Sequence, residues 1–287
     1  MDYSIGIEVL TIGEMDTKAG SYELSFALLL TSDEIDFTKC PPPSEWIFTN
    51  GYVTNMWGEI TEPNFHKVNI QGVFYNQMDF RDYPFEVIEL SIELGVLYPL
   101  TIENIQFSPN MEYSGDYIAA KYISGYNVGK VQVETGELET PFATFPHYSM
   151  TIPLSHDSVM VFMKKIFPVI ILAGFGYSTF FMSPKILQDR ITLLGAVFVA
   201  AIFFHTILLM GELPPIGYLT IADKIMITVY SVFTLTLISV LLQQRYANLV
   251  ETDNKDFSIM YAATIDKKLI KSTPIIAIML FMLLQFT

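Results

Sequence analysis

Six residues between positions 189 and 206 recur at intervals of three or four, the spacing that brings side chains onto one face of a helix. They are Asp189, Thr192, Ala196, Val199, Phe203 and Thr206. An acid begins the series, a threonine stands near each end, and bulky apolar side chains occupy the middle. In a ring of such helices, this face would attract cations at one mouth and form an apolar constriction at Val199 and Phe203.

The segment that carries this series runs from Ile191 to Met210 without a formal charge. It is long enough, as a helix, to cross the hydrocarbon core of a bilayer. The alternative to a pore wall is a lipid-facing anchor, in which threonine hydroxyls bond back to their own helix. The rest of the chain must decide between the two.

Composition divides the chain into two parts. With 51% hydrophobic residues and a mean hydropathy of +0.40, the 287-residue chain is too apolar for an ordinary soluble protein. Residues 1–159 carry 23 Asp and Glu against 6 Lys and Arg, a net charge of −17, whereas residues 160–287 carry 7 against 10. The acidic part disfavours nucleic acid and anionic lipid as partners and favours cations. The single cysteine, Cys40, excludes an intrachain disulfide.

The acidic part, residues 1–159, is predicted to be a β-sandwich domain of about ten strands. Apolar and polar residues alternate from Tyr3 to Ile12 and again from Tyr22 to Leu30, the pattern of an opening hairpin. Further short runs follow, and none shows a helical period over more than two turns. These runs are 46–48, 68–75, 85–94, 117–123, the neighbourhood of Gln132, and 148–153.

No set of residues for catalysis can be assembled, so we predict neither enzymatic activity nor a cofactor. The four histidines are scattered, at His66, His147, His156 and His205. There is no metalloprotease helix motif, nucleophile elbow or phosphate loop. Glu134, Glu137 and Glu139 offer the oxygen ligands that calcium prefers and are candidate ligands of a modulatory calcium ion. The alternative for these carboxylates is a solvated turn.

The second part, residues 160–287, is predicted to be a transmembrane domain of four helices. The expected spans are about 160–182, 190–210, 220–243 and 258–287. Basic residues occur in the first loop at Lys185 and Arg190 and crowd the third loop, whereas the second loop, 211–220, has none. By the positive-inside rule, the amino-terminal domain and the C-terminus lie outside the cell. Because residues 1–30 lack an export signal, we expect a signal peptide or a further domain upstream.

Several segments of the chain together form a recognisable series. They are the opening hairpin 5–30, the loop 80–86, Pro168 in the first span, the start of the second span at 189–193, and the segment 213–223. In this order and spacing they resemble the pentameric ligand-gated ion channels over nearly the whole chain. The loop reads Tyr-Pro-Phe-Glu where the family normally has Phe-Pro-Phe-Asp, and no cysteines bracket it. The chain therefore resembles a prokaryotic member without the Cys-loop disulfide.

This resemblance implies that Asp189 contributes to an acidic ring at the cytoplasmic mouth of a cation-selective pore. It also implies that the series from Thr192 to Thr206 lines the pore, with Val199 and Phe203 as the closed gate. A second register would turn Leu193, Val197, Ala200, Phe204 and Ile207 inward. We prefer the first register because it places both threonines in water. An anion channel stays open as an alternative, since Arg190 and Lys185 lie near the same mouth.

The resemblance further implies a route of coupling between the two domains. Its residues are Tyr83, Pro84, Phe85 and Glu86 in the loop, His156, and Pro214, Pro215 and Tyr218 in the linker between spans. The family usually has an arginine twelve residues before the first-span proline, and here that position is His156. A contact between Glu86 and His156 would make gating sensitive to protons, because imidazole titrates near neutral pH. The alternative is a histidine that is merely tolerated there.

Agonists of the family bind between neighbouring sandwiches, among aromatic side chains. The candidates by location are Tyr98, Tyr126, Phe142, Phe145 and Tyr148. Each of them also fits a core or loop position. The loop 135–147 is expected to cap this site.

The sequence therefore predicts a homopentameric, cation-selective, ligand-gated channel in a bacterial inner membrane. Its partners would be the lipid bilayer, permeant cations and a small-molecule or ionic agonist. The rival is a membrane-anchored sandwich that binds a ligand or an adhesive partner without conducting ions. This rival accounts for the two-part composition equally well, but not for an Asp-Arg pair at the start of a threonine-bearing span.

Overall fold

The computed structural model describes residues 1–42, 46–116, 125–183, 185–211, 213–249 and 255–286, and their contacts divide them into two compact units. The first unit consists of Met1–Asp79 and Glu86–Asp157, and the second of Phe80–Phe85 and Ser158–Thr287. The short segment Phe80–Phe85 thus belongs with the helices, although strands precede and follow it in the sequence. Residues 117–123, where a further strand was expected, lie outside the described residues.

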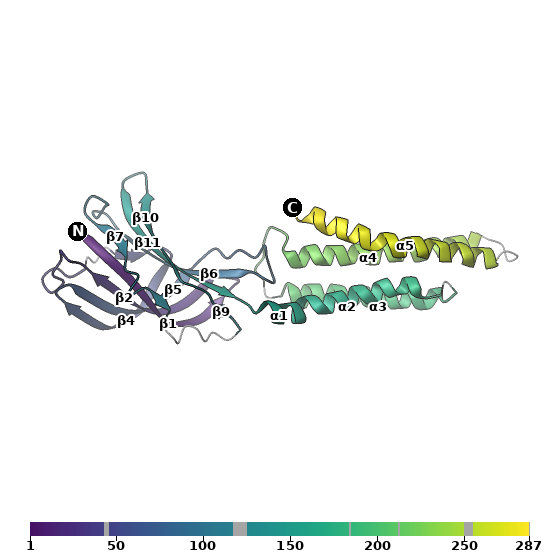
Figure 1. Ribbon diagram of the computed structural model, residues 1–287, viewed down its shortest axis with the longest axis horizontal. Coiled ribbons are helices and arrows are strands. Elements are labelled where there is room, and N and C mark those ends of the chain that lie inside the picture. Colours follow the sequence, from purple (N-terminus) through teal and green to yellow (C-terminus); the bar gives the residue numbers. More distant parts are fainter. Residues whose placement is uncertain (43–45, 117–124, 184, 212, 250–254, 287) are drawn as a thin grey trace. The chain divides into compact units, whose positions relative to one another are not determined.

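The first unit is an all-β structure, as predicted. Among its described residues, the strands form a six-stranded and a five-stranded sheet (Figure 1). The first sheet has the order β4 (Gly51–Glu62), β5 (Phe65–Tyr75), β2 (Ser21–Thr31), β1 (Asp2–Asp16) and β7 (Gln106–Pro109), with β8 (Gly115–Asp116) beside β1. The second has the order β10 (Gln132–Glu139), β11 (Thr144–Ser155), β6 (Val87–Val96) and β3 (Trp46–Phe48), with β9 (Asn127–Val128) beside β11. The expected opening hairpin is confirmed by the antiparallel pairing of β1 with β2.

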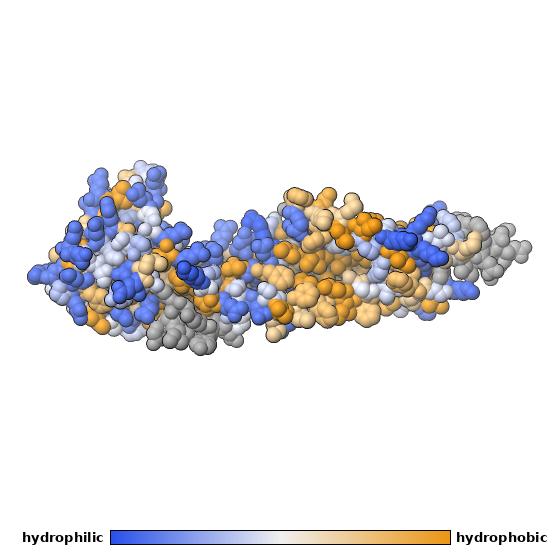
Figure 2. All heavy atoms as spheres, viewed as in Figure 1, coloured by the Kyte–Doolittle hydropathy of each residue, from blue (hydrophilic) through white to orange (hydrophobic). Residues whose placement is uncertain are grey.

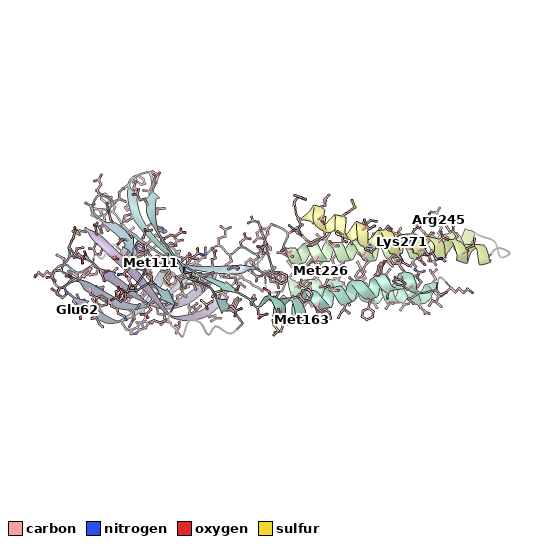
Figure 3. The ribbon with its side chains drawn as sticks, in the orientation of Figure 1. Glu62, Met111, Met163, Met226, Arg245 and Lys271 are labelled. Carbon is pink, nitrogen blue, oxygen red and sulfur yellow. The ribbon has the colours of Figure 1, made fainter. Side chains whose placement is uncertain are left out.

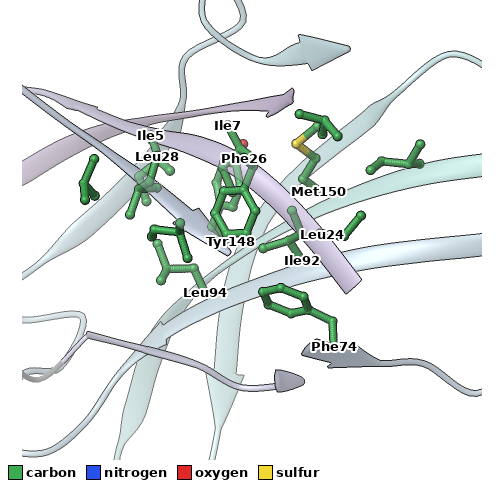
Figure 4. Packing of buried hydrophobic residues seen from close by; sticks show 14 of the residues in the cluster. Ile5, Ile7, Leu24, Phe26, Leu28, Phe74, Ile92, Leu94, Tyr148 and Met150 are labelled. Atoms are coloured by element: carbon green, nitrogen blue, oxygen red, sulfur yellow. The ribbon is translucent and has the colours of Figure 1, made fainter. Parts of the chain in front are cut away.

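The core of this unit is formed by the alternate side chains of the central strands. Phe26 from β2 and Phe74 from β5 are fully buried, as are Ile92 from β6 and Met150 from β11 (Figure 4). Because successive side chains of a strand point to opposite faces, one set of residues in each strand reaches this cluster. The alternation in the sequence therefore reports the burial correctly for the central strands.

Strand β4 is the longest of the described strands that the alternation did not predict. It forms one edge of the first sheet, and its large side chains Met56, Trp57 and Ile60 are 57%, 42% and 50% exposed. Because the strand buries neither of its faces fully, its sequence carries no clear period of two.

The second unit consists of helices. The first stretch comprises α1 (Ser158–Val161), the π-helical turn η2 (Phe162–Ile166), α2 (Phe167–Ser178) and the 3-10 turn η3 (Thr179–Phe181). The next is α3 (Leu187–Phe203), which continues as the π-helix η4 (Phe204–Leu209). Two long helices follow, α4 (Ile221–Leu249) and α5 (Lys255–Leu284).

Among the described residues, three stretches are long and apolar enough to cross a membrane, namely Ser158–Phe181, Leu187–Ile207 and Ile221–Arg245. Figure 2 shows a dense band of hydrophobic residues over the helices. Helix α4 continues beyond the predicted end at 243, and Figure 3 shows Met226 near one of its ends and Arg245 near the other. Its last turns contain Gln, Arg, Ala and Leu, which are good helix formers. Helix α5 lies where the fourth span was expected and contains Pro274.

Pro168 does not lie in the first turn of its helical stretch, which begins ten residues earlier at Ser158. It is the second residue of α2 and lies two residues after Ile166, the last residue of the π-helical turn η2. Proline has no amide hydrogen and crowds the turn before it, so a wider turn at this point accommodates it.

Candidate functional site

The six residues of the candidate pore series share the exposed face of α3 and its π-helical extension. Asp189, Thr192, Ala196, Val199, Phe203 and Thr206 are all exposed. Val199 and Phe203 are 66% and 62% exposed, although both are large and apolar. Among the described residues of one chain, this face is largely uncovered.

The opposite face of α3 is packed. Leu194, Val197 and Ala201 are buried, and α3 contacts both α2 and α4. The second register considered for the pore requires Val197 on the open face, yet Val197 is only 7% exposed. The first register, which follows the exposed series, agrees better with the burial of the helix.

Both threonines of the series use their hydroxyl hydrogens within the helix. Thr192 Oγ1 donates to the Gln188 carbonyl oxygen at 3.0 Å, and Thr206 Oγ1 donates to the Ile202 carbonyl oxygen at 2.9 Å. A hydroxyl that donates in this way presents lone pairs outward. The exposed face therefore offers oxygen acceptors near both ends, which suits a cation or its hydration water.

Arg190, the residue after Asp189, turns away from that face and is completely buried. Its guanidinium forms two hydrogen bonds with the Asp266 carboxylate of α5, Nη1 to Oδ2 at 3.2 Å and Nη2 to Oδ1 at 3.1 Å. Nη1 also donates to Gln243 Oε1 on α4 at 2.9 Å. The positive charge near the candidate mouth is thus matched by a buried carboxylate, while Asp189 and Lys185 are exposed.

The predicted coupling loop lies against the start of α4. The backbone amides of Ile221 and Ala222 donate to the carbonyl oxygens of Arg81 and Tyr83, both at 3.0 Å. The first amides of a helix have no partner within the helix, so these two bonds cap it from outside. Segment Phe80–Phe85 therefore caps the N-terminus of α4.

Side chains strengthen the same junction. The Phe80 amide donates to the Tyr218 hydroxyl at 2.9 Å, and the Arg81 guanidinium lies 5.0 Å from the centre of the Tyr218 ring. Lys165 Nζ donates to the Tyr83 hydroxyl at 2.8 Å. The structure thus joins the loop to the linker through Phe80, Arg81 and Tyr218, and joins the loop to η2 through Tyr83 and Lys165.

The remaining coupling residues differ in exposure. Pro84 is buried, Phe85 is 38% exposed, and Glu86 is 5% exposed. In the linker, Pro214 is partly buried and Pro215 is exposed.

His156 has partners of its own in the sheet unit. Its Nδ1 lies 2.8 Å from the Gly125 carbonyl oxygen, and its ring stacks on Tyr126 with the centroids 4.2 Å apart. The expected contact with Glu86 stays a prediction, because these two interactions involve Nδ1 and the ring face and not Nε2.

One residue of the candidate site that the sequence did not single out is His205, in the π-helix η4. Its Nε2 lies 3.1 Å from Asp223 Oδ1 and its Nδ1 lies 3.1 Å from the Tyr230 hydroxyl. Asp223 Oδ2 accepts hydrogen bonds from the Thr220 amide and hydroxyl, both at 2.9 Å. Thr220 and Asp223 form a capping box at the start of α4, and the Thr-x-x-Asp spacing was the signal available in the sequence.

The five aromatic residues proposed for the ligand site occupy different environments. Tyr98 and Phe142 are 79% and 96% exposed, whereas Tyr148 is fully buried in the sheet core. Tyr148 is therefore a core tyrosine, and its burial raises its pKa to about 12. Tyr126 stacks on His156, and Phe145 is partly buried in β11.

The three glutamates proposed for calcium lie in β10 rather than in a loop. Glu134, Glu137 and Glu139 are exposed, and the alternation of a strand directs Glu134 and Glu137 to opposite faces. Among the residues that the structure describes, no group of three or more His, Cys, Asp or Glu side chains is arranged to hold a metal ion.

The sheet unit contains a cavity of about 710 Å³ that the sequence did not indicate. Trp46, Phe48, Glu59 and His66 are among its lining residues. His66 is 7% exposed, and its Nδ1 lies 3.0 Å from Thr61 Oγ1. Burial lowers the pKa of His66, and the nearby Glu59 carboxylate opposes this effect.

Comparison with known proteins adds no identification. No protein-family model matches the chain. No curated protein is similar to it either.

Proposed function

We propose that this chain is one subunit of a homopentameric, cation-selective ligand-gated ion channel. The observation that carries the proposal is the exposed face of α3, on which an acid, two threonines and two large apolar residues follow one another along a membrane-crossing helix. This is the composition of a pore wall with a charged mouth and an apolar gate. The resemblance to the pentameric ligand-gated channels supplies the number of subunits.

Assembly into a ring is supported by a groove of about 590 Å³ between α2 and α3. It is lined almost entirely by apolar side chains, including Pro168, Leu172, Val199 and Phe203. Exposed apolar surface of this kind marks a contact with lipid or with another chain. In the proposed assembly, α3 of the neighbouring subunit packs beside this groove next to Ile171, Leu172 and Ala200, while Ala196, Val199 and Phe203 at its edge face the pore.

Selectivity for cations is supported by the charges near the start of α3. Asp189 is exposed, whereas Arg190 is buried and paired. Five acidic sheet units of −17 each would add about −85 formal charges outside the membrane and concentrate cations there.

Gating would pass through the junction at α4. A movement of the sheet unit that displaces segment Phe80–Phe85 would disturb the capping bonds to Ile221 and Ala222. From there, Asp223 and His205 lead to the end of the pore helix. Calcium remains a candidate modulator, and the agonist would be a small molecule or an ion. In this proposal α5 is the fourth span, and both termini lie outside the bacterial inner membrane.

The proposal is tested by recording current from the purified protein in planar bilayers under a KCl gradient, with and without millimolar calcium. We expect currents that reverse near the potassium equilibrium potential. Asp189→Ala is expected to move the reversal potential toward zero, while Asp189→Glu, which keeps the charge, leaves it in place. Currents that reverse near the chloride potential would contradict the selectivity. Silence under all conditions would favour the anchored, non-conducting sandwich.

A further inference from the structure

We infer that Asp266 is a selectivity-determining residue, because it neutralises Arg190 and leaves Asp189 as the only charge that this part of α3 presents to the pore. The inference rests on the proposed function and deepens it. It concerns a residue on α5, a helix that contributes no residue to the pore series.

The pairing geometry is specific. Two guanidinium nitrogens of Arg190 face the two carboxylate oxygens of Asp266, at 3.1 and 3.2 Å. Such a bidentate pair fixes both the position and the orientation of the guanidinium. A lysine in the same place could not form it. Arg190 is therefore oriented by Asp266 as well as neutralised.

Two polar residues of α4 complete the site. Gln243 Nε2 donates to Asp266 Oδ1 at 2.7 Å and to Ser239 Oγ at 3.0 Å, and its Oε1 accepts from Arg190 at 2.9 Å. Ser239 Oγ in turn donates to Asp266 Oδ1 at 3.3 Å. The charges are thus held in a hydrogen-bonded network that joins α3, α4 and α5.

This network is internal to one chain. The side chains of Arg190 and Asp266 are 0% and 5% exposed, and Ser239 and Gln243 are buried as well. The pairing therefore needs no neighbouring subunit and is present before assembly.

The direction of the two adjacent charges follows from helix geometry. Successive residues of an α-helix point about 100° apart, so Asp189 and Arg190 cannot both face the same side. Asp189 lies on the exposed face, and Arg190 lies on the packed face toward α4 and α5. Without Asp266, the guanidinium would be an uncompensated buried charge, which is costly. The Arg190 side chain would then turn toward water, or its charge would repel cations near Asp189.

The test compares reversal potentials of three proteins under a KCl gradient: wild type, Asp266→Asn, and the double variant Arg190→Gln with Asp266→Asn. In Asp266→Asn the side chain keeps its shape and loses its charge, so we expect the ratio of potassium to chloride permeability to fall by at least about threefold. The double variant removes both charges and keeps polar side chains, so we expect the wild-type ratio. Asp266→Glu, which keeps the charge, serves as the conservative control.

The outcomes separate the inference from the proposed function. A cation-selective wild type whose ratio is unchanged in Asp266→Asn would overturn the inference alone. If Asp266→Asn fails to assemble alone, its coassembly with wild-type subunits decides: a ratio that falls with the share of variant subunits supports the inference, and an unchanged ratio overturns it. A ratio raised several-fold in the double variant would show that Arg190 had opposed cations from the pore, which would also overturn the inference. A wild type that carries no current, or only anion current, overturns the proposed function and this inference with it.

Discussion

His205 Nε2 lies 3.1 Å from Asp223 Oδ1, so η4, which extends the candidate pore helix α3, is bonded to the first turn of α4. Asp223 also caps that turn through Thr220, and the amides of the same turn bond to segment Phe80–Phe85. One helix terminus therefore connects the loop between two strands to the helix that carries the candidate gate.

Replacing His205 by Phe is expected to destabilise the protein by about 1–3 kcal/mol, because the carboxylate of Asp223 loses a partner while it stays largely buried. The midpoint of thermal unfolding in detergent measures this loss. Thr206→Ala is the matched control, since Thr206 is exposed and its hydroxyl donates to a carbonyl oxygen of its own helix. An equal effect of both substitutions would argue against a special role of the His205–Asp223 bond.

Cysteine labelling distinguishes the two faces of α3. In a Cys40→Ser background, Val199→Cys is expected to react with a water-soluble thiol reagent at least about tenfold faster than Val197→Cys. The reason is that Val199 is 66% exposed in the chain and would face the water-filled pore, whereas Val197 is 7% exposed and packed. Comparable rates at both positions would mean that the pore register is wrong.

Wetting of the apolar constriction provides a second pore test. Val199→Thr keeps the shape of the side chain and adds a hydroxyl, so we expect it to raise the current recorded without agonist. Val197→Thr places the same hydroxyl on the packed face and is expected to leave this current unchanged. A larger resting current in the Val197 variant would contradict the assignment of the gate.

Close packing of α2 against α4 depends on Gly176. A Cβ at this position would come within 2.2 Å of the buried Phe233 ring, whereas a Cβ at Gly174 would meet no atom within 4 Å. Gly176→Ala is therefore expected to cost about 1–3 kcal/mol. Gly174→Ala is expected to be neutral or stabilising by up to about 1 kcal/mol, because alanine favours a helix. Thermal unfolding of the two variants side by side checks this difference.

Acid is expected to destabilise the sheet unit through His66. Burial lowers the pKa of His66 in the folded state. Below about pH 6.5, the imidazole is therefore protonated more readily in the unfolded chain than in the folded chain. Stability contributed by the neutral imidazole is thus present above that pH and is lost as the pH falls below it. His66→Gln should unfold with a midpoint that drops less between pH 7 and pH 5 than that of the wild type. An identical drop in both proteins would remove His66 as the cause.

The strands that could be predicted are those with one buried face. In β2, Tyr22, Leu24 and Phe26 alternate with more exposed residues, and the period of two is visible in the sequence. In β4, by contrast, almost every side chain is exposed, and the strand is held mainly by backbone pairing with β5. Backbone pairing places little demand on the side chains, so it leaves no pattern to detect.

The exposed face of α3 was accessible from spacing because it lies within one helix. The partners of Arg190 and His205 were not, because Asp266 lies 76 residues from Arg190 in the sequence and Asp223 lies 18 residues from His205. Such pairs depend on how helices pack, and composition does not encode that directly. The burial of Tyr148 could not be foreseen for a similar reason, since a core tyrosine and a binding tyrosine look alike in a sequence.

The assignment of Phe80–Phe85 to the helical unit limits how the two units can be exchanged between proteins. A single crossover after Asp157 would graft a foreign loop onto the α4 terminus and discard the carbonyl groups of Arg81 and Tyr83 that are matched to it. A chimera that preserves the native cap must carry residues 80–85 together with the helices, which requires three junctions rather than one. The boundary between exchangeable units is therefore defined by the hydrogen bonds of segment Phe80–Phe85 and not by its place in the chain.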